Sequence, residues 1–338
     1  MLNVGIIGAA GYTGEALIDI LLGHPEVRIT SLSRRSAQTS HICDIFPRFA
    51  GRLDLSVGQV DLKQLKAKCD AVFCALPHTA SMELVPKLLS AGKKVIDLSA
   101  DYRLKDTRVY RKFYNVTHKD AANLKSSVYG LPELYRNKIK GATLVANPGC
   151  YPTAALLALA PLAGLGLADT SSIIIDAKSG TSGAGKKAEE GLLFSEVHGD
   201  FKAYKVNAHQ HMPEIDQVLS RIAQKKVQVV FVPHLLPVKR GILATVYARK
   251  SSKAKSRAAI QLFRKFYKKE PFIRVRQEGD FPRLADVQGT NFCDIGIKEE
   301  KDCYIVIAAI DNLLKGASGQ AVQNMNIMYK FPETLGLL

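Results

Sequence analysis

The chain has 338 residues, of which 47 are basic and 31 are acidic, and its formal net charge is +16. Apolar residues make up 47% and charged residues 23%, the proportions of a soluble globular protein. This length is too great for one ordinary core and predicts two domains. The basic residues form dispersed pairs without an arginine-rich block, which argues against nucleic-acid binding and favours small anionic substrates.

Neither a membrane anchor nor a metal site is expected. The longest apolar stretch, 154–167, is interrupted by Pro161 and Gly164 and is too short to span a bilayer. The N-terminus enters an apolar strand without the charged segment of a signal peptide. Six scattered cysteines without a C-x-x-C pair argue against disulfides and zinc, so we expect a reducing, cytoplasmic location.

The chain begins with an apolar strand and a glycine-rich turn with G-x-x-G-x-x-G spacing, followed by an amphipathic helix. The spacing is a variant of the dinucleotide fingerprint, in which backbone N–H groups approach a pyrophosphate at a helix N-terminus. We therefore expect a bound dinucleotide, although glycines alone also occur in purely structural turns. The candidate cofactor-binding residues here are Gly8, Ala10, Gly11, Tyr12, Thr13 and Gly14.

The next strand, 27–32, ends in Ser33, Arg34, Arg35 and Ser36. Enzymes that use NAD usually place an acidic residue at this distance, to hold the ribose 2′-hydroxyl. A guanidinium group suits a 2′-phosphate instead, so the sequence predicts NADP rather than NAD. The alternative is that both arginines are solvated loop residues.

Short apolar strands at 71–76 and 94–98 alternate with helical patterns at 62–68 and 81–89. This alternation predicts a Rossmann-type, doubly wound parallel sheet in an α/β domain. Ligands of such sheets bind beyond the carboxyl ends of the strands. The loop that begins at Pro77 lies at such an end, and we include Pro77 among the candidate cofactor-binding residues.

A cysteine follows the apolar strand 142–146, within the segment N-P-G-C-Y-P-T at 147–153. We expect Pro152 to open the next helix, since proline suits the first helical position. Cys150 would then lie in the turn before the helix, where unpaired N–H groups and the helix dipole favour a thiolate. Cys150 is therefore our candidate nucleophile; the alternative is a small buried apolar residue.

The second half of the chain changes character. The expected strands are 172–177, 227–232, 241–247 and 304–310, and the expected helices are 214–224 and 258–268. Their composition predicts an α+β domain on a mixed or antiparallel sheet, with a last helix at 317–329 returning to the first domain. The predicted domains are 1–149 with 311–338, and 150–310; the polar segment 104–140 is interpreted as an excursion over the first sheet.

Two loops of the second half carry chemical groups. Residues 179–186 offer backbone N–H groups and hydroxyls that suit an oxyanion or phosphate. His209 and His211 lie two residues apart, which places them on the same side of an extended segment before a helix. No further ligand follows at metal spacing, so we favour a general acid/base over zinc, with a surface histidine pair as the alternative.

These motifs resemble the N-acetyl-gamma-glutamyl-phosphate reductases of arginine biosynthesis, relatives of aspartate-semialdehyde dehydrogenase. The matching segments are GAAGYTG (8–14), DLSADYRL (97–104), YGLPE (129–133), NPGCYPT (147–153), SGTSGAG (179–185), 241–244 and AIDNLLKGASGQAVQNMN (309–326). Gln210 takes the place of an arginine that the family usually carries. Tyr-Pro-Thr after the cysteine resembles the members that act on the free N-acetylglutamyl substrate, rather than those that act on carrier-bound aminoadipyl or glutamyl phosphates.

The resemblance implies an enzyme that reduces an acyl phosphate with NADPH through a thioester on Cys150, with His209 or else His211 as acid/base, in a homotetramer or homodimer. It adds cofactor-binding candidates: Ser179, Gly180, Asn312, Lys315 and Gly316. The substrate-binding candidates are Arg103, Asn147, Ser182, Gly183 and Glu214. Other hypotheses are an aspartyl-phosphate or carrier-linked acyl-phosphate reductase, a non-enzymatic NADP sensor and a nucleic-acid-binding protein.

Overall fold

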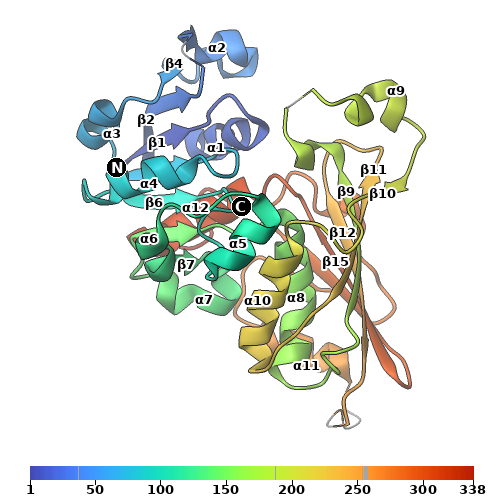
Figure 1. The fold of residues 1–338 in the computed structure, drawn as a ribbon. Helices are drawn as coiled ribbons and strands as arrows, with labels where there is room; N and C mark the ends of the chain where they lie inside the picture. Colours follow the sequence, from blue (N-terminus) through green and yellow to red (C-terminus); the bar gives the residue numbers. More distant parts are fainter. Residues whose placement is uncertain (37, 187, 253, 255–257) are drawn as a thin grey trace. The chain divides into compact units, whose positions relative to one another are not determined.

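The computed structural model describes residues 1–36, 38–186, 188–252, 254 and 258–338, which form two units (Figure 1). The first comprises Met1–Pro148 and Ala317–Leu338, and the second comprises Gly149–Gly316. Gly149 and residues 311–316 lie in the second unit, whereas the sequence predicts them in the first. Both Asp311 and Asn312 are bound there: Arg240 Nη2 lies 3.0 Å from Asp311, and Gly241 donates its N–H to Asn312 over 2.7 Å.

An eight-stranded sheet forms the core of the first unit, with the order β3-β4-β2-β1-β5-β6-β8-β7. β3 runs antiparallel to β4, and the other neighbours pair in parallel, which confirms the predicted Rossmann-type sheet. The strands are β1 (Leu2–Ile7), β2 (Val27–Arg34), β3 (Ser40–His41), β4 (Ser56–Gln59), β5 (Ala71–Cys74), β6 (Lys94–Asp97), β7 (Val128–Tyr129) and β8 (Leu144–Ala146).

The helices of the first unit are α1 (Tyr12–Leu22), α2 (Ile42–Ile45), η1 (Pro47–Phe49), α3 (Leu62–Lys68), α4 (Ser81–Leu89), α5 (Thr107–Tyr114), α6 (Ala121–Ser126), α7 (Pro132–Ile139) and α12 (Ser318–Tyr329). The last of these packs against α1 and α7, which lie far from it in the sequence (Figure 1). Its Asn324 amide donates to the Gly130 carbonyl (2.9 Å) and to the Asn147 side chain (3.0 Å). Buried amides therefore hold α12 in the first unit.

Two fully buried carboxylates organise the loops after β5 and β6. Asp101 accepts the main-chain N–H groups of Thr79 (2.7 Å) and Ser81 (3.0 Å), and Thr79 has a left-handed φ of 76°. Asp97 accepts the hydroxyls of Ser81 and Ser99, both over 2.7 Å. Burial and the neighbouring Asp101 raise the pKa of Asp97 to about 7.

The second unit contains a seven-stranded mixed sheet with the order β10-β11-β9-β12-β15-β14-β13. Its strands are β9 (Ile174–Gly180), β10 (Lys202–Ala203), β11 (Val230–Leu236), β12 (Ile242–Arg249), β13 (Ile273–Val275), β14 (Cys293–Glu299) and β15 (Cys303–Ile310). Its helices are α8 (Cys150–Gly164), η2 (Thr181–Ala184), η3 (Glu190–Leu192), α9 (Phe194–Val197), α10 (Met212–Ala223), α11 (Ala259–Phe266) and η4 (Leu284–Asp286). The mixed sheet confirms the predicted class.

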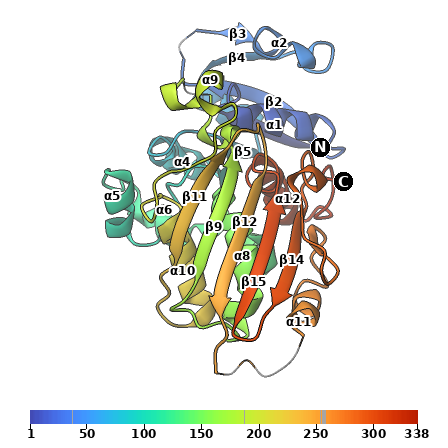
Figure 2. The ribbon, with the colours of Figure 1, turned by 90° about the vertical axis from the view of Figure 1, so that its right-hand side faces the viewer.

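Helices cover one face of this sheet. Figure 2 shows β11, β9, β12, β15 and β14 side by side, with α8 and α10 behind them. On the other face, Val230, Ile174 and Tyr247 lie in register and are 46%, 43% and 39% exposed. Beside them, Asp176 pairs with Lys178 (3.0 Å) and with His234 (3.1 Å). This open face is apolar with a small charged centre.

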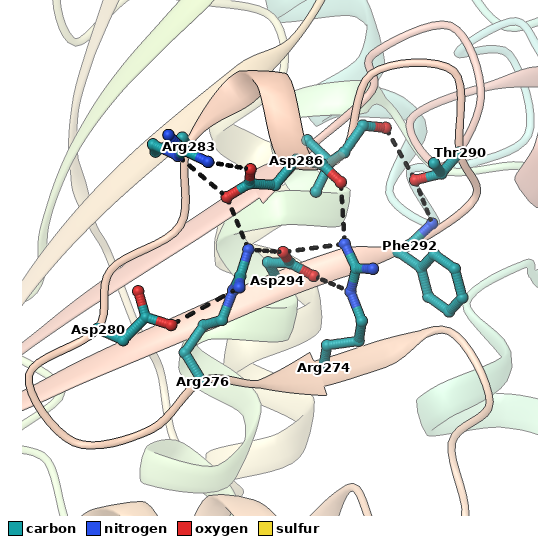
Figure 3. A network of polar contacts seen from close by, with 9 residues as sticks. Arg274, Arg276, Asp280, Arg283, Asp286, Thr290, Phe292 and Asp294 are labelled. Atoms are coloured by element: carbon teal, nitrogen blue, oxygen red, sulfur yellow. Dashed lines mark hydrogen bonds and ion pairs between the residues drawn. The ribbon is translucent and has the colours of Figure 1, made fainter.

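An ion-pair network closes the β13 edge of the sheet (Figure 3). The buried Asp294 receives hydrogen bonds from Arg274 and, over 2.7 Å, from Arg276. The same Arg276 also contacts Asp286, and Asp286 in turn pairs with Arg283, both over 2.7 Å. The network therefore ties two strands to the loop that contains η4.

Among the described residues, no helix is long and apolar enough to cross a membrane, and no group of three or more His, Cys, Asp or Glu side chains is arranged to hold a metal ion. All six cysteines are free thiols.

Candidate active site

Cys150 is the first residue of α8, and Gly149 is its N-cap. The sequence prediction that Pro152 opens the helix is wrong, because the helix begins two residues earlier. Proline fits there because the first N–H groups of a helix have no intrahelical acceptor. The first α-helical bond runs from the Thr153 N–H to the Gly149 carbonyl (2.9 Å). Cys150 therefore lies directly at the positive end of the dipole, which favours a thiolate.

Two residues fix the backbone around this cysteine. Glu214, in the first turn of α10, is 1% exposed, and its carboxylate accepts the Gly149 N–H over 2.9 Å. Gly316, the last residue of the second unit in the sequence, packs against the cysteine. A Cβ at this glycine would lie 2.8 Å from the Cys150 Cβ. Only glycine permits this approach without a shift.

The two histidines lie on a turn, not on an extended segment as predicted. Lys205 and Asn207 have left-handed φ values of 44° and 52°, and the Ala208 N–H donates to the Lys205 carbonyl over 3.0 Å. The imidazole rings of His209 and His211 lie 4.8 Å apart, so the turn still places them together. The His211 N–H donates to Nδ1 of His209 over 3.0 Å.

Tyr151 connects the cysteine to the histidines. Its ring meets those of His209 and His211 edge to face, with centroids 5.4 and 6.0 Å apart. Its hydroxyl lies 3.1 Å from that of Tyr204. Burial, followed by the neighbouring Tyr204, raises the pKa of Tyr151 far above its usual range. The phenol is therefore neutral and is not an acid/base; the imidazoles are the groups suited to that role.

The loop after β9 is held in place by the buried Asn312. Asn312 is 2% exposed; its amide nitrogen donates to the Ser182 hydroxyl (2.9 Å) while its oxygen accepts the Gly241 N–H (2.7 Å). Gly180 donates its N–H to the Gly241 carbonyl over 2.9 Å. The loop therefore presents a positioned hydroxyl, which suits an anionic group. Lys315 is fully buried, with its ammonium 5.6 Å from the Phe272 ring centroid.

In the first unit, the glycine-rich turn is close-packed against the sheet. Gly8 has a φ of 91°, and a Cβ there would lie 2.0 Å from the Ala75 carbonyl oxygen. At Gly14 a Cβ would lie 2.3 Å from the Gly8 oxygen, whereas Gly11 is open, with its nearest atom at 3.6 Å. The turn therefore leaves room for a pyrophosphate at the N-terminus of α1, as in dinucleotide-binding domains.

The two arginines after β2 differ in their contacts. Arg34 donates to the Gln38 carbonyl (2.9 and 2.6 Å) and to the Ser40 hydroxyl (2.9 Å), and thereby closes the loop. Arg35 and Ser36 are exposed at the surface of the same loop, and Ser33 is buried beneath it. Pro77 is exposed after β5.

Arg103 is buried among backbone carbonyls. It is 4% exposed and donates to the carbonyls of Asn147 and Leu98, both over 2.7 Å. The Asn147 amide in turn donates to the Ala317 carbonyl over 3.0 Å. Both residues thus hold the ends of β6 and β8, and their contact with a substrate remains a prediction.

Sequence reasoning did not single out Tyr204, Asp97 or Asp101 as parts of a site. Nothing around Tyr204 distinguishes it, since only the fold brings it to Tyr151. The two aspartates carried a signal: both lie in the D-L-S-A-D segment, which begins at the last residue of the apolar strand β6.

Two family models match the chain: "Semialdehyde dehydrogenase, NAD binding domain" over residues 3–142 and "Semialdehyde dehydrogenase, dimerisation domain" over residues 150–312. Proteins named N-acetyl-gamma-glutamyl-phosphate reductase from Geotalea daltonii and Symbiobacterium thermophilum are 49% and 48% identical to it over 340 residues. These alignments span 100% of this chain and 98% and 97% of the relatives. The chain belongs to the N-acetyl-gamma-glutamyl-phosphate reductase family. It is therefore an oxidoreductase, and its first unit is a nicotinamide-dinucleotide-binding domain.

Solved structures share the fold of this family member at low identity. Aspartate semialdehyde dehydrogenase II from Vibrio cholerae, complexed with ASA, has a TM-score of 0.73 at 18% identity and covers 98% of both chains. The Candida albicans aspartate semialdehyde dehydrogenase with NADP has a TM-score of 0.71 at 16% identity, over 97% of this chain and 98% of that one.

Proposed function

We propose that this protein reduces N-acetyl-L-glutamyl 5-phosphate to N-acetyl-L-glutamate 5-semialdehyde and phosphate with NADPH, a step of arginine biosynthesis, through a thioester on Cys150. The observation that carries the proposal is Cys150 at the first position of α8, followed by Tyr151, whose ring contacts both imidazoles. A thiolate at a helix N-terminus with a histidine nearby is the arrangement of a nucleophilic catalyst. The names of the relatives supply the substrate.

In this mechanism the Cys150 thiolate attacks the acyl-phosphate carbonyl, and a C–S bond forms as the π electrons move to oxygen. The oxyanion collapses, the C–O bond to phosphate breaks, and a thioester remains. Bound NADPH supplies the hydride that reduces it. The helix N-terminus of α8 and an imidazole of His209 or His211 stabilise the oxyanions, with the histidine as acid/base. The thiolate then leaves and releases the aldehyde.

NADP is the proposed form of the cofactor. Gly8, Gly11 and Gly14 would form the turn that holds its pyrophosphate: Gly8 and Gly14 allow the turn to pack closely, and Gly11 leaves open space at the start of α1. Arg35, exposed on the loop that Arg34 closes, would meet the 2′-phosphate. The other proposed cofactor contacts are Ala10, Tyr12, Thr13, Ser33, Pro77, Ser179, Gly180, Asn312, Lys315 and Gly316.

The substrate carries several negative charges, and the proposed contacts include donors that suit them. The Ser182 hydroxyl accepts from Asn312, which leaves its own proton for a substrate oxygen. Gly183 follows in the same loop, where a Cβ would lie 3.2 Å from the Ser179 hydroxyl. The remaining proposed substrate contacts are Arg103, Asn147 and Glu214.

We also propose a homo-oligomer, a dimer or tetramer, in a cytoplasmic location. The open apolar face of the second sheet supports this, since exposed apolar patches of this kind mark protein interfaces. A second copy would cover Ile174, Val230 and Tyr247. Light scattering after size exclusion measures the mass; a monomer at micromolar concentration would contradict the proposal.

The decisive experiment for the function is the reverse reaction. N-acetylglutamate 5-semialdehyde should reduce NADP only when phosphate is present, which tests substrate, cofactor and phosphorolysis together. The Cys150→Ser variant should lose the activity by several orders of magnitude, as other enzymes do without their nucleophile. Faster turnover with aspartate semialdehyde, or near-wild-type turnover of Cys150→Ser, would overturn the proposal.

A further inference from the structure

The chain between the loop after β9 and the turn that carries the two histidines has almost no core of its own. Of residues 188–208, all of which the structure describes, only Val197 is buried. Four large apolar side chains of this segment are 52% to 80% exposed: Leu193, Phe194, Phe201 and Val206. Single exposed apolar residues are ordinary on a protein surface, whereas a group of this size marks a surface that another molecule covers.

The contacts that hold α9 in place are short-range. The Val197 N–H donates to the Leu193 carbonyl and the Asp200 N–H donates to the Val197 carbonyl, both over 3.1 Å. The short strand β10 follows and pairs with β11 through Lys202 and Ala203. Figure 1 and Figure 2 both show α9 apart from α8 and α10, the helices that cover the sheet. The sheet therefore holds this segment at its C-terminal end, and apolar packing adds little.

Tyr204, near the end of the segment, belongs to the candidate active site. Its hydroxyl lies 3.1 Å from that of Tyr151, and its ring centroid lies 5.7 Å from that of His209. Directly after it, Lys205 and Asn207 have left-handed φ values, which cost free energy in residues other than glycine and persist only where the surroundings fix them. The geometry of the site therefore depends on what holds this segment.

The exposed side chains of the segment continue the open face of the second sheet. The Phe201 ring stacks on the His234 imidazole, with centroids 5.0 Å apart and planes at 22°. His234 pairs with Asp176 in the charged centre of the open face, over 3.1 Å. The segment also lies within residues 150–312, which match the dimerisation domain of the family. A second copy of the chain on the open face would therefore meet Phe201 as well.

We propose that the second copy that covers the open face also covers Phe194 and Phe201, and that this contact holds Tyr204 and the histidine turn in their catalytic arrangement. The active site is then complete only in the oligomer, although the same chain supplies Cys150 and both histidines. Tyr204 has a positioning role, because it acts through Tyr151 and His209. The proposal deepens the proposed function and rests on both the thioester chemistry and the homo-oligomer.

A charge placed on the segment tests the contact. Phe194 is exposed in the single chain, so Phe194→Asp leaves the fold intact, but it would bury a carboxylate in the interface. We expect the dissociation constant of the oligomer, measured by analytical ultracentrifugation, to rise about 10- to 100-fold. Leu165→Asp is the matched control, because Leu165 is 49% exposed at the C-terminal end of α8. An unchanged dissociation constant in Phe194→Asp would overturn the proposal.

A substitution outside the segment tests the link between the interface and the site. Tyr247 lies on the open face, opposite Ile174 in register. We expect Tyr247→Asp to be monomeric and the amides of residues 190–208 to exchange with deuterium about tenfold faster than in the wild type, while α8 keeps its protection. A monomeric variant with wild-type exchange in these residues would overturn the proposal. Protection of these residues by NADPH in the monomer would also overturn it, since the cofactor would then be the cover.

Turnover measured against protein concentration separates this proposal from the proposed function. The rate of phosphate-dependent NADP reduction per subunit should follow the fraction of oligomer in Phe194→Asp and Tyr247→Asp, and should equal that of the wild type in Leu165→Asp. A variant that is fully active as a monomer overturns this inference alone. If the wild type shows no such reaction, the proposed function fails, and the dissociation constants and exchange rates still decide whether a second copy covers the segment.

Discussion

The Gly149 N–H donates to the Glu214 carboxylate over 2.9 Å, so a buried negative charge lies at the N-terminus of the helix that carries Cys150. This charge opposes a thiolate at the same helix end. Glu214→Gln keeps an acceptor for Gly149 and removes the charge. We expect the pH profile of Cys150 alkylation by iodoacetamide to move to lower pH in this variant, measured without substrate or cofactor.

Glu214→Ala is the matched comparison, because it removes both the charge and the acceptor. The unpaired buried N–H costs about 1–3 kcal/mol, so the start of α8 should loosen and kcat should fall further than in Glu214→Gln. Cys150→Ser measures the background alkylation of the other cysteines. A residue that only binds substrate would leave the alkylation profile unchanged in both variants, and that outcome would contradict this prediction.

The separate roles of Arg34 and Arg35 lead to a cofactor prediction. Arg35→Ala should raise the KM for NADPH by about 10- to 100-fold, the loss of one charge-assisted contact, and change the KM for NADH little. Arg34→Ala should weaken the binding of both cofactors, because it releases the Gln38 carbonyl and the Ser40 hydroxyl. Initial rates with each cofactor measure this. An unchanged NADPH-to-NADH preference in Arg35→Ala would contradict it.

Asp97 predicts a pH dependence of stability. Its pKa is raised to about 7 in the folded protein by burial and by Asp101, and it is near 3.9 in an unfolded chain. The folded state therefore binds more protons between these values. Its contribution to stability is full below about pH 4 and is lost as the pH rises through 7, by up to about 1.4 kcal/mol per unit.

The Asp97→Asn variant isolates this effect, since its amide can still meet the hydroxyls of Ser81 and Ser99. Urea unfolding followed by circular dichroism at pH 5, 6, 7 and 8 gives the difference in unfolding free energy between wild type and variant. We expect the unfolding free energy of the variant to rise relative to that of the wild type as the pH rises. A difference independent of pH would show that Asp97 titrates normally.

The Asp294 network predicts a large effect on stability from one carboxylate (Figure 3). Asp294→Asn leaves Arg274 and Arg276, 41% and 26% exposed, without their shared counter-charge. The expected loss is about 1–3 kcal/mol, below that of a fully buried pair because both guanidinium groups keep some water. Asp280→Asn is the control: this carboxylate is 53% exposed and 3.6 Å from Arg276, so a change within about 0.5 kcal/mol is expected in urea unfolding.

Burial on both faces leaves continuous apolar runs, and these runs made β1, β2, β5, β6 and β8 of the first sheet and the helix after the cysteine predictable, whereas β3, β4 and β7 were not predicted. The same rule missed β14, where Asp294 and Gly296 interrupt the run. Both positions depend on partners far along the chain: two arginines at Asp294, and at Gly296 the Asp280 carbonyl oxygen, 2.9 Å from where a Cβ would lie. The apolar pattern of a short segment cannot predict contacts with residues distant in the sequence.

The loops that carry the candidate site residues could be predicted from the sequence, but the contacts between those residues could not. The positions of Cys150, His209 and His211 followed from motifs, yet the turn that joins the histidines depends on left-handed Lys205 and Asn207. Neither residue type signals that conformation as glycine would. The hydrogen bonds of Glu214 and Asn312 likewise connect segments distant in sequence, and only the folded chain brings them together.

The position of α12 has a consequence for how the chain folds during synthesis. Its Asn324 amide bonds Gly130 and Asn147, and it packs on α1 and α7, yet it is translated after the whole of residues 149–316. A nascent chain that has emerged only as far as β8 therefore lacks α12, the helix that covers part of the core of the first unit. The ribosome makes the second core complete before it makes the helix that finishes the first.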